Sequence, residues 1–161
     1  MVISIVVVLV GALLDRVWFY QELAEKTAME QVAGALQNAL TMQYGSLMTQ
    51  GKESLVSGLA VENPMNWLQK KPGNYSGEFY DPTPRSVAPG NWVFDLKSRD
   101  MVYVLNHSEH FVPGKDGNKW VRYHVKLIHE PLPGASGGTE KALAGLLFAP
   151  VVPYDWFGRG G

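Results

Sequence analysis

The chain has 161 residues, enough for one domain plus an extension, and carries 14 basic and 15 acidic residues for a net charge of −1. Beyond an uncharged N-terminal stretch these charges are dispersed without a basic stripe, so the composition gives no support for a nucleic-acid partner. The chain has no cysteine, which excludes disulfide bonds, cysteine-ligated zinc and thiol catalysis. Its five Trp, seven Tyr and ten Pro indicate a body rich in strands and turns.

The first segment of the chain is MVISIVVVLVGALLDRVWFYQ, in which residues 1–14 carry no charge and Asp15 and Arg16 follow. A helix formed by the uncharged residues 1–14 spans roughly 21 Å, whereas a membrane helix must cross a hydrocarbon core of about 30 Å. A secretory signal has a basic region in front of its apolar run and a small-residue cleavage site behind it, and the segment shows neither pattern. Two interpretations remain: a helix buried in the core, or part of a membrane helix whose first residues precede Met1. The second accounts better for the short length.

Beyond residue 14, apolar residues continue in steps of three or four, which is the period of an α-helix. The charged side chains between residues 20 and 30 fall off this stripe, and neither Pro nor Gly interrupts residues 12–33. The pattern predicts one continuous helix from near Met1 to about Thr49, ended by Gly51. We expect its amphipathic half, residues 15–50, to pack on a sheet through Val17, Tyr20, Ala24, Ala28, Val32, Ala35, Leu36, Ala39 and Leu40.

The region after the long helix is rich in proline. A short second helix is predicted over residues 52–61, and Asn63 followed by Pro64 predicts a helical turn with the proline at its first position. Residues 62–91 contain five prolines and are expected to form a long irregular connection, held in place by aromatic side chains.

The last third of the chain has the alternation of β-strands. Residues 92–97 and 101–106 are predicted to form a hairpin, and Asp116-Gly117 has the sequence of a second hairpin turn. The stretch KWVRYHVKLIHE alternates as a half-buried strand, whereas the final segment, residues 141–161, fits a strand or a short helix equally in its middle. We therefore expect a head of residues 51–161 with an antiparallel sheet over 92–157. The side chains of the alternating strand that we expect to face the core are Val121, Tyr123, Val125 and Leu127.

The sequence contains no nucleophile elbow, phosphate-binding loop, dinucleotide fingerprint or zincin motif. His107 and His110 lie three residues apart in NHSEHF, but a metal site would need further ligands to converge, and we expect a solvated polar loop. Asp95 and Asp100 flank a turn and fit an acid pair, a calcium contact or local hydrogen bonding, and His124 is expected to be exposed. We predict no catalytic residue, no cofactor and no metal site; the nearest metal candidates are His107, His110, Asp95 and Asp100.

A half-apolar, half-amphipathic N-terminal helix followed by an antiparallel sheet resembles the type IV pilin and type II secretion pseudopilin family. The segment MVISIVVVLVGALLDRVWFYQ is similar to the distal part of that family's N-terminal methylated helix. The stretches NPMNWLQKKPGNYSGEF and PGNWVFDLKSRDMVYVLN also resemble a segment of minor-pilin and pseudopilin-like proteins of Gram-negative bacteria. Residues 1–50 match by residue type and residues 62–106 by motif, whereas residues 107–161 match nothing in the family.

The resemblance implies an α+β, pilin-like fold and a structural subunit of a type IV pilus or a type II secretion pseudopilus-like filament, in either a major or a minor role. Its partners would be copies of itself or related pilins and the assembly machinery. The helix would lie in the inner membrane with an extracytoplasmic head, and later in a periplasmic or cell-surface filament of a Gram-negative bacterium. The family's leader and the first residues of its helix are expected to precede Met1. The apolar half, residues 1–14, would be buried in the membrane or filament through Met1, Val2, Ile3, Ile5, Val6, Val7, Val8, Leu9, Val10, Gly11, Leu13 and Leu14.

Two other functions stay open at this point. The chain could be a monomeric membrane-anchored extracytoplasmic binding module, for which the same helix serves only as an anchor. It could also be a soluble domain or enzyme whose apolar N-terminus packs inside. Only this last function requires residues 1–14 for folding.

Overall fold

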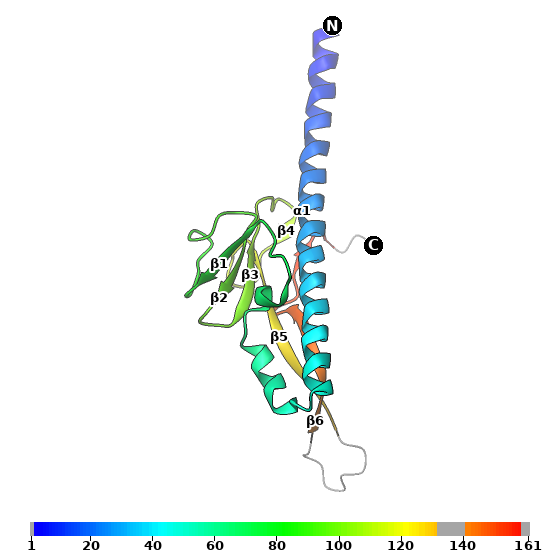
Figure 1. The fold of residues 1–161 in the computed structure, drawn as a ribbon. Coiled ribbons are helices and arrows are strands. Elements are labelled where there is room, and N and C mark those ends of the chain that lie inside the picture. Colours follow the sequence, from blue (N-terminus) through cyan, green and yellow to red (C-terminus); the bar gives the residue numbers. More distant parts are fainter. Residues whose placement is uncertain (1, 132–140, 159–161) are drawn as a thin grey trace.

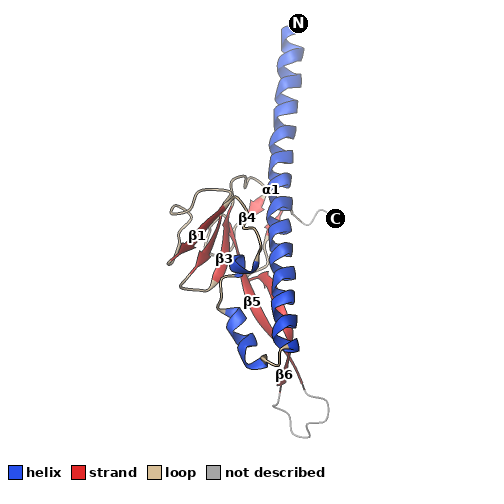
Figure 2. Ribbon diagram, viewed as in Figure 1, coloured by secondary structure: helices blue, strands red, loops and turns tan. Residues whose placement is uncertain are grey.

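The computed structural model describes residues 2–131 and 141–158, and it shows one long helix with a head of strands and short helices along its second half (Figure 1). This confirms the expected α+β class. Figure 2 separates the helices from the strands of the head. The elements are α1 (Val2–Thr49), the 3₁₀ helices η1 (Glu53–Ala60) and η2 (Pro64–Trp67), and strands β1 (Tyr75–Phe79), β2 (Trp92–Asp95), β3 (Asp100–Val104), β4 (Phe111–Val112), β5 (Trp120–Pro131), β6 (Lys141–Pro150) and β7 (Asp155–Trp156).

The long helix ends as the sequence predicts. Gly51 adopts a φ of 67°, a left-handed conformation that glycine reaches without steric cost. The Lys52 N–H donates to the Leu47 carbonyl at 2.9 Å, and the Gly51 N–H donates to the Met48 carbonyl at 3.2 Å. This pair of hydrogen bonds is the Schellman ending, which satisfies carbonyls that the last turn of a helix leaves free. The turn at Asn63 is confirmed as well, since its side chain caps η2 by accepting from the Met65 N–H.

Five strands form the main sheet in the order β1-β2-β3-β5-β6. The predicted hairpin is confirmed, because β2 and β3 are antiparallel with Asp95 opposite Asp100. The irregular connection expected over residues 62–91 needs correction, because it contains β1, which pairs with β2 in parallel. The β1 segment, YSGEF, has an irregular register between Tyr75 and Glu78 and a φ of 103° at Gly77. This bulge breaks the alternation by which a strand is recognised in a sequence.

Strands β5 and β6 form the longest antiparallel pair of the sheet. The inward face of β5 is confirmed, with Val121, Tyr123 and Val125 buried. The final segment, for which strand and helix were both open, forms the strand β6. Helix α1 lies along β6, and its Gln37 side chain accepts the Phe148 N–H at 2.6 Å. The helix therefore satisfies a backbone donor of the last strand in the sheet.

The second hairpin expected at Asp116-Gly117 is wrong. A turn does form there, because the Gly117 N–H donates to the Gly114 carbonyl and Gly117 has a φ of 67°. However, β4 pairs with β7 from the end of the chain rather than with the next strand, β5. Aromatic packing accounts for this pairing, because the rings of Phe111 and Trp156 meet edge to face at 5.6 Å and both side chains are buried.

The main hydrophobic core lies between the sheet and α1, and a smaller one on the other side of the sheet is built around Val93 and Val102. The helix meets the main core through a face that was only partly predicted. Of the predicted packing residues, the ones on the packed side are Val32, Leu36, Ala39 and Leu40. The others lie exposed: Val17, Tyr20, Ala24, Ala28 and Ala35.

The packed face of α1 is centred about a third of a turn away from the predicted stripe, at 3.6 residues per turn. It runs through Glu22, Met29, Leu36 and Leu40, all of which are buried. Two causes explain the wrong prediction. The apolar stripe beginning at Val17 is real but lies on the free side of the helix, and the packed face includes a glutamate, which hydrophobic periodicity assigns to solvent.

We predict that the two faces differ sharply in their contribution to stability. Leu36→Ala should lower the free energy of unfolding by about 2–5 kcal/mol, because Leu36 is fully buried. Met42→Ala should change it by less than about 0.5 kcal/mol, because the Met42 side chain is 77% exposed. Urea unfolding in detergent, followed by tryptophan fluorescence, measures both. Equal losses in the two variants would contradict the assignment of the packed face.

Candidate functional site at the long helix and its junction with the head

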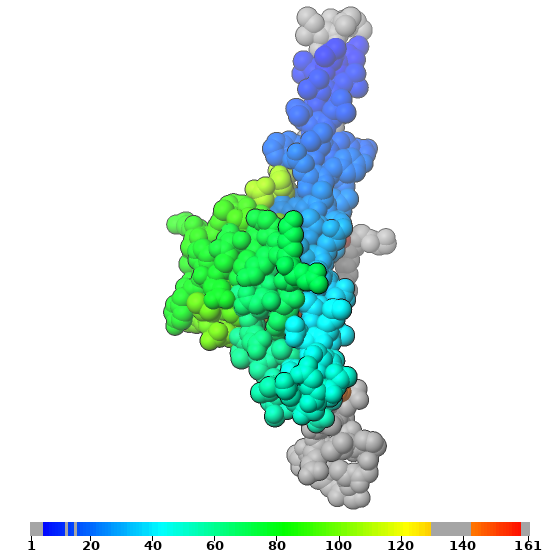
Figure 3. Space-filling view, in the orientation of Figure 1, coloured from blue at the N-terminus to red at the C-terminus, as the bar shows by residue number. Residues whose placement is uncertain are grey.

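The first half of α1 stands clear of the head (Figures 1 and 3). Its large apolar side chains from Ile5 to Leu14 are between 48% and 70% exposed, and nothing approaches Gly11 within 4 Å of where a Cβ would lie. This overturns the interpretation of the segment as a helix buried in the core. Val2 and Ile3 are helical in their backbone, while their side chains and Met1 lie outside the described residues. In the part of the chain that the structure describes, no helical stretch combines the length and the hydropathy needed to cross a bilayer.

Aromatic side chains surround the point where α1 reaches the head. Trp18, Phe19 and Tyr20 are all exposed, directly after the apolar half. The Phe19 ring lies 5.7 Å from the ring of His110 and 5.2 Å from that of Phe157, measured between centroids. The first contacts between helix and head are therefore made by aromatic rings.

Glu22 is one of the glutamates that join α1 to the head, and its side chain is only 2% exposed. Its Oε1 accepts the backbone N–H of His110 at 2.9 Å and the indole N–H of Trp156 at 2.8 Å. Its Oε2 lies 2.7 Å from His110 Nδ1. Burial raises the pKa of Glu22, but the hydrogen bonds from His110 and Trp156 outweigh it and leave the pKa below its ordinary value. Glu22 is therefore held as a carboxylate.

Glu25 makes the second connection, one turn further along the helix. Its Oε1 accepts the Asn106 N–H at 2.6 Å and the Tyr103 hydroxyl at 3.0 Å. Its Oε2 accepts the His107 N–H at 2.7 Å and lies 2.9 Å from His107 Nδ1. Burial and the charge of Glu25 raise the pKa of Tyr103, so its hydroxyl remains protonated and available as a donor.

The sequence predicts a solvated polar loop at NHSEHF. The structure corrects this prediction, because the loop is hydrogen-bonded to two glutamates of α1. His107 and His110 face two different glutamates, and the described residues hold no cluster of three or more His, Cys, Asp or Glu side chains that could bind a metal ion. Sequence reasoning missed this junction. Glu22 and Glu25 have the same spacing of three residues as His107 and His110, but equal spacing does not by itself bring a helix and a loop together. Hydrophobic patterning assigns all four side chains to solvent.

The other candidate residues form an ion network on the sheet face turned away from α1. Arg122 Nη2 lies 2.8 Å from Asp95 Oδ2, and Arg122 Nη1 lies 3.4 Å from Asp100 Oδ2. His124 Nδ1 lies 2.8 Å from Asp100 Oδ1, so His124 is paired rather than merely exposed. Burial raises the pKa of Asp95, but hydrogen bonds from Lys97, Ser98 and Arg122 bring it below its ordinary value. Local hydrogen bonding is confirmed for Asp95, which accepts from the Lys97 N–H and the Ser98 hydroxyl, whereas Asp100 is bonded by Arg122 and His124 of β5. The two buried carboxylates tie β2, β3 and β5 together.

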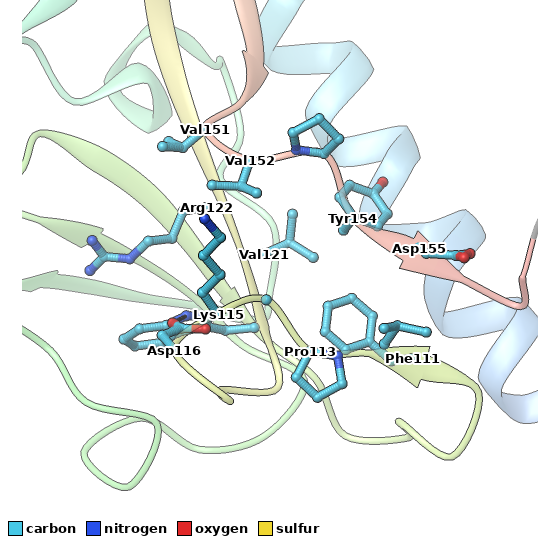
Figure 4. A pocket seen from close by; sticks show the side chains of 14 residues that line it. Phe111, Pro113, Lys115, Asp116, Val121, Arg122, Val151, Val152, Tyr154 and Asp155 are labelled. Atoms are coloured by element: carbon cyan, nitrogen blue, oxygen red, sulfur yellow. Dashed lines mark hydrogen bonds between the residues drawn. The ribbon is translucent and has the colours of Figure 1, made fainter.

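An open groove of about 580 Å³ lies between the β4–β7 pair and the start of β5 (Figure 4). Its apolar surface comes from Phe111, Val121 and Tyr154, with Val151 and Val152 at one side. Two of the charged groups at the groove, Asp116 and Arg122, are engaged within the head. Asp116 accepts from Asn118 and Trp120, and Arg122 contacts Asp95 and Asp100. The groove is an open, mostly apolar hollow, and its lining residues form no converging set of reactive groups.

Comparison of the chain with protein-family models, with curated proteins and with solved structures gave no match. What the protein does must therefore be inferred from its own geometry.

We predict that the buried glutamate is essential for the junction. Glu22→Ala should lower the free energy of unfolding by about 2–3 kcal/mol, because the buried indole N–H of Trp156 and the partly buried backbone N–H of His110 lose their acceptor. Glu109→Ala, at an exposed carboxylate of the same loop, is the control and should cost less than about 0.5 kcal/mol. Urea unfolding in detergent gives both values. A loss for Glu22→Ala as small as that of the control would show that the junction contributes nothing to stability.

Acid should weaken the protein through its buried carboxylates. Glu22 and Asp95 have pKa values lowered from 4.5 and 3.8, so the unfolded state binds more protons than the native state. Their contribution is complete above about pH 4.5 and is lost as the pH falls through the lower native values. Unfolding free energies measured from pH 6 down to 3 should fall below that point, and less steeply in Glu22→Gln. A slope centred well above pH 5 would contradict this assignment.

Proposed function

We propose that the chain is a structural subunit of a filament of the type IV pilus or type II secretion pseudopilus kind, assembled through the apolar half of α1. One observation carries the proposal: the large apolar side chains from Ile5 to Leu14 are exposed along a helix that projects from the head. Burying each of them is worth about 1.5–3 kcal/mol relative to water. A contiguous apolar surface made of this many large side chains marks a site of interaction with a protein or a membrane.

The junction with the head supports the same function. Because Glu22 and Glu25 together accept backbone N–H groups from three residues of one loop, the helix is fixed in both position and rotation relative to the head. Residues 5–17 then project by about 18 Å as a rod. Such a rod can insert between equivalent rods of neighbouring subunits, while the head covers the outside.

The pilin-like form of the α+β fold belongs to this proposal. In it, the amphipathic half of α1 packs on the sheet and the apolar half is left for assembly. The proposed partners are copies of the chain or related pilins, the assembly machinery, and the inner membrane before assembly. Moving apolar side chains from lipid to neighbouring helices gains little from the hydrophobic effect, so close packing must provide the specificity. Gly11, which has open space around it, permits such close approach.

A second function, that of a monomeric membrane-anchored binding module, uses the same helix as a simple anchor. The groove beside β4 and β7 favours it, because a head that binds a partner needs a contact surface of this kind. The two functions differ in whether the apolar halves of several copies meet.

Crosslinking at the apolar half separates the two functions. The natural chain has no cysteine, so Leu9→Cys introduces a single reactive site at an exposed position. Treatment of host cells with a bifunctional maleimide should give covalent dimers, the largest product possible with one cysteine per chain, because the reagent joins two thiols. The same variant dissolved in SDS before treatment is the control and should stay monomeric. Monomers alone after maleimide treatment of intact membranes would reject the filament and favour the anchored module.

A further inference from the structure

The charges of α1 are distributed unevenly around its circumference. At about 100° per residue, all its charged positions fall within one half of the helix surface. The other half carries no charge from one end of the helix to the other. The charged positions are Asp15, Arg16, Glu22, Glu25, Lys26 and Glu30.

The uncharged half carries an exposed apolar stripe, which we call the outer face. Its residues recur in steps of three or four, with gaps at Gln31 and Asn38. It begins in the apolar half and continues far beside the head. The outer face consists of Val6, Val10, Leu13, Val17, Tyr20, Ala24, Ala28, Ala35 and Met42, all of which are exposed.

The head does not use the outer face. It packs on the side of α1 that carries Met29, Leu36 and Leu40, about a third of a turn away. One helix therefore has two apolar faces, of which the head buries only one. The large side chains of Tyr20 and Met42 are among the most exposed apolar groups of the molecule, at 57% and 77%.

A bilayer cannot cover the whole outer face. From Val6 to Met42 the helix rises by about 54 Å, whereas a hydrocarbon core is about 30 Å thick. The head also lies beside α1 from Glu22 onward, and it carries the ion pairs of Arg122 with Asp95 and Asp100 as well as polar loops. Lipid can therefore accompany only the first part of this face.

A partner that covers the outer face along its whole length must itself present a long uncharged surface. A charged partner face would be desolvated against these side chains without compensation. The outer face of a second copy meets both conditions, being equally long and equally free of charge. Alanines at positions 24, 28 and 35 allow close approach of two helix backbones, and Tyr20 and Met42 provide bulk on either side.

We propose that the outer face is a helix–helix interface with α1 of a second copy, extending past the apolar half as far as Met42. The inference rests on the proposed filament, and it adds which side of the helix is used and how far the contact runs. The head-bearing half of α1 is thus packed on both sides, by its own head and by a neighbouring helix.

Site-specific photocrosslinking tests this interface in the full chain in its host membranes. Met42→benzoylphenylalanine places the probe on the outer face, and Thr41→benzoylphenylalanine places it about 100° away at another exposed position. Leu9→benzoylphenylalanine reports on the apolar half. We expect crosslinks to a second copy from positions 9 and 42, identified by mass, and at least fivefold weaker ones from position 41.

The outcomes separate this inference from the proposed function. Crosslinks from position 9 with equal yields from positions 41 and 42 would overturn the interface while leaving the filament intact. No crosslinks from any of the three would reject the filament and the interface together. Crosslinks from position 42 to a protein of another mass would show that the outer face binds a different partner.

Discussion

The position of the head on α1 depends on the hydrogen bonds that two glutamates of the helix accept from it. Glu22 accepts three hydrogen bonds while almost fully buried, and Glu25 accepts bonds from a loop and from Tyr103. A buried carboxylate without such partners would be strongly unfavourable, so the loop at residues 106–110 and the β7 strand have to lie where their donors reach it. The position of Trp156, at the far end of the chain, follows from this requirement.

The same contacts decide which side of the helix faces the core. On apolar content alone, the stripe through Val17, Ala24 and Ala28 could pack against a sheet as well as the face through Met29 and Leu36. If the head packed on the first stripe, Glu22 and Glu25 would lie away from their hydrogen-bond donors. The head therefore packs on the face that carries the two glutamates, and the apolar stripe remains exposed. The free outer face is thus a consequence of the polar junction.

The sequence predicts those elements whose signal is local. The helix to Thr49 with its Gly51 ending, the hairpin of β2 and β3, and the inward face of β5 follow from periodicity and turn chemistry. The parallel strand β1 and the pairing of β4 with β7 depend on partners distant in the chain, and a bulge at Gly77 hides the first. The candidate site was missed for a related reason. Single-residue hydrophobicity assigns glutamate and histidine to solvent, and the partners lie far apart in the chain, 82 residues for Glu25 and His107 and 88 for Glu22 and His110.

Buried ion pairs contribute less to net stability than to the uniqueness of an arrangement, since apolar residues of the same size often pack as well. At this junction, uniqueness means a fixed rotation of the helix against the head. A leucine in place of Glu22 would lose the bonds to the His110 N–H and the Trp156 indole, whereas the directional hydrogen bonds of the glutamate favour one register. In the filament we propose, every subunit must present its outer face at the same angle to its neighbours, because a repeating contact forms only between identical geometries. We infer that the glutamates are used here to set that angle, and that the apolar core supplies most of the stability.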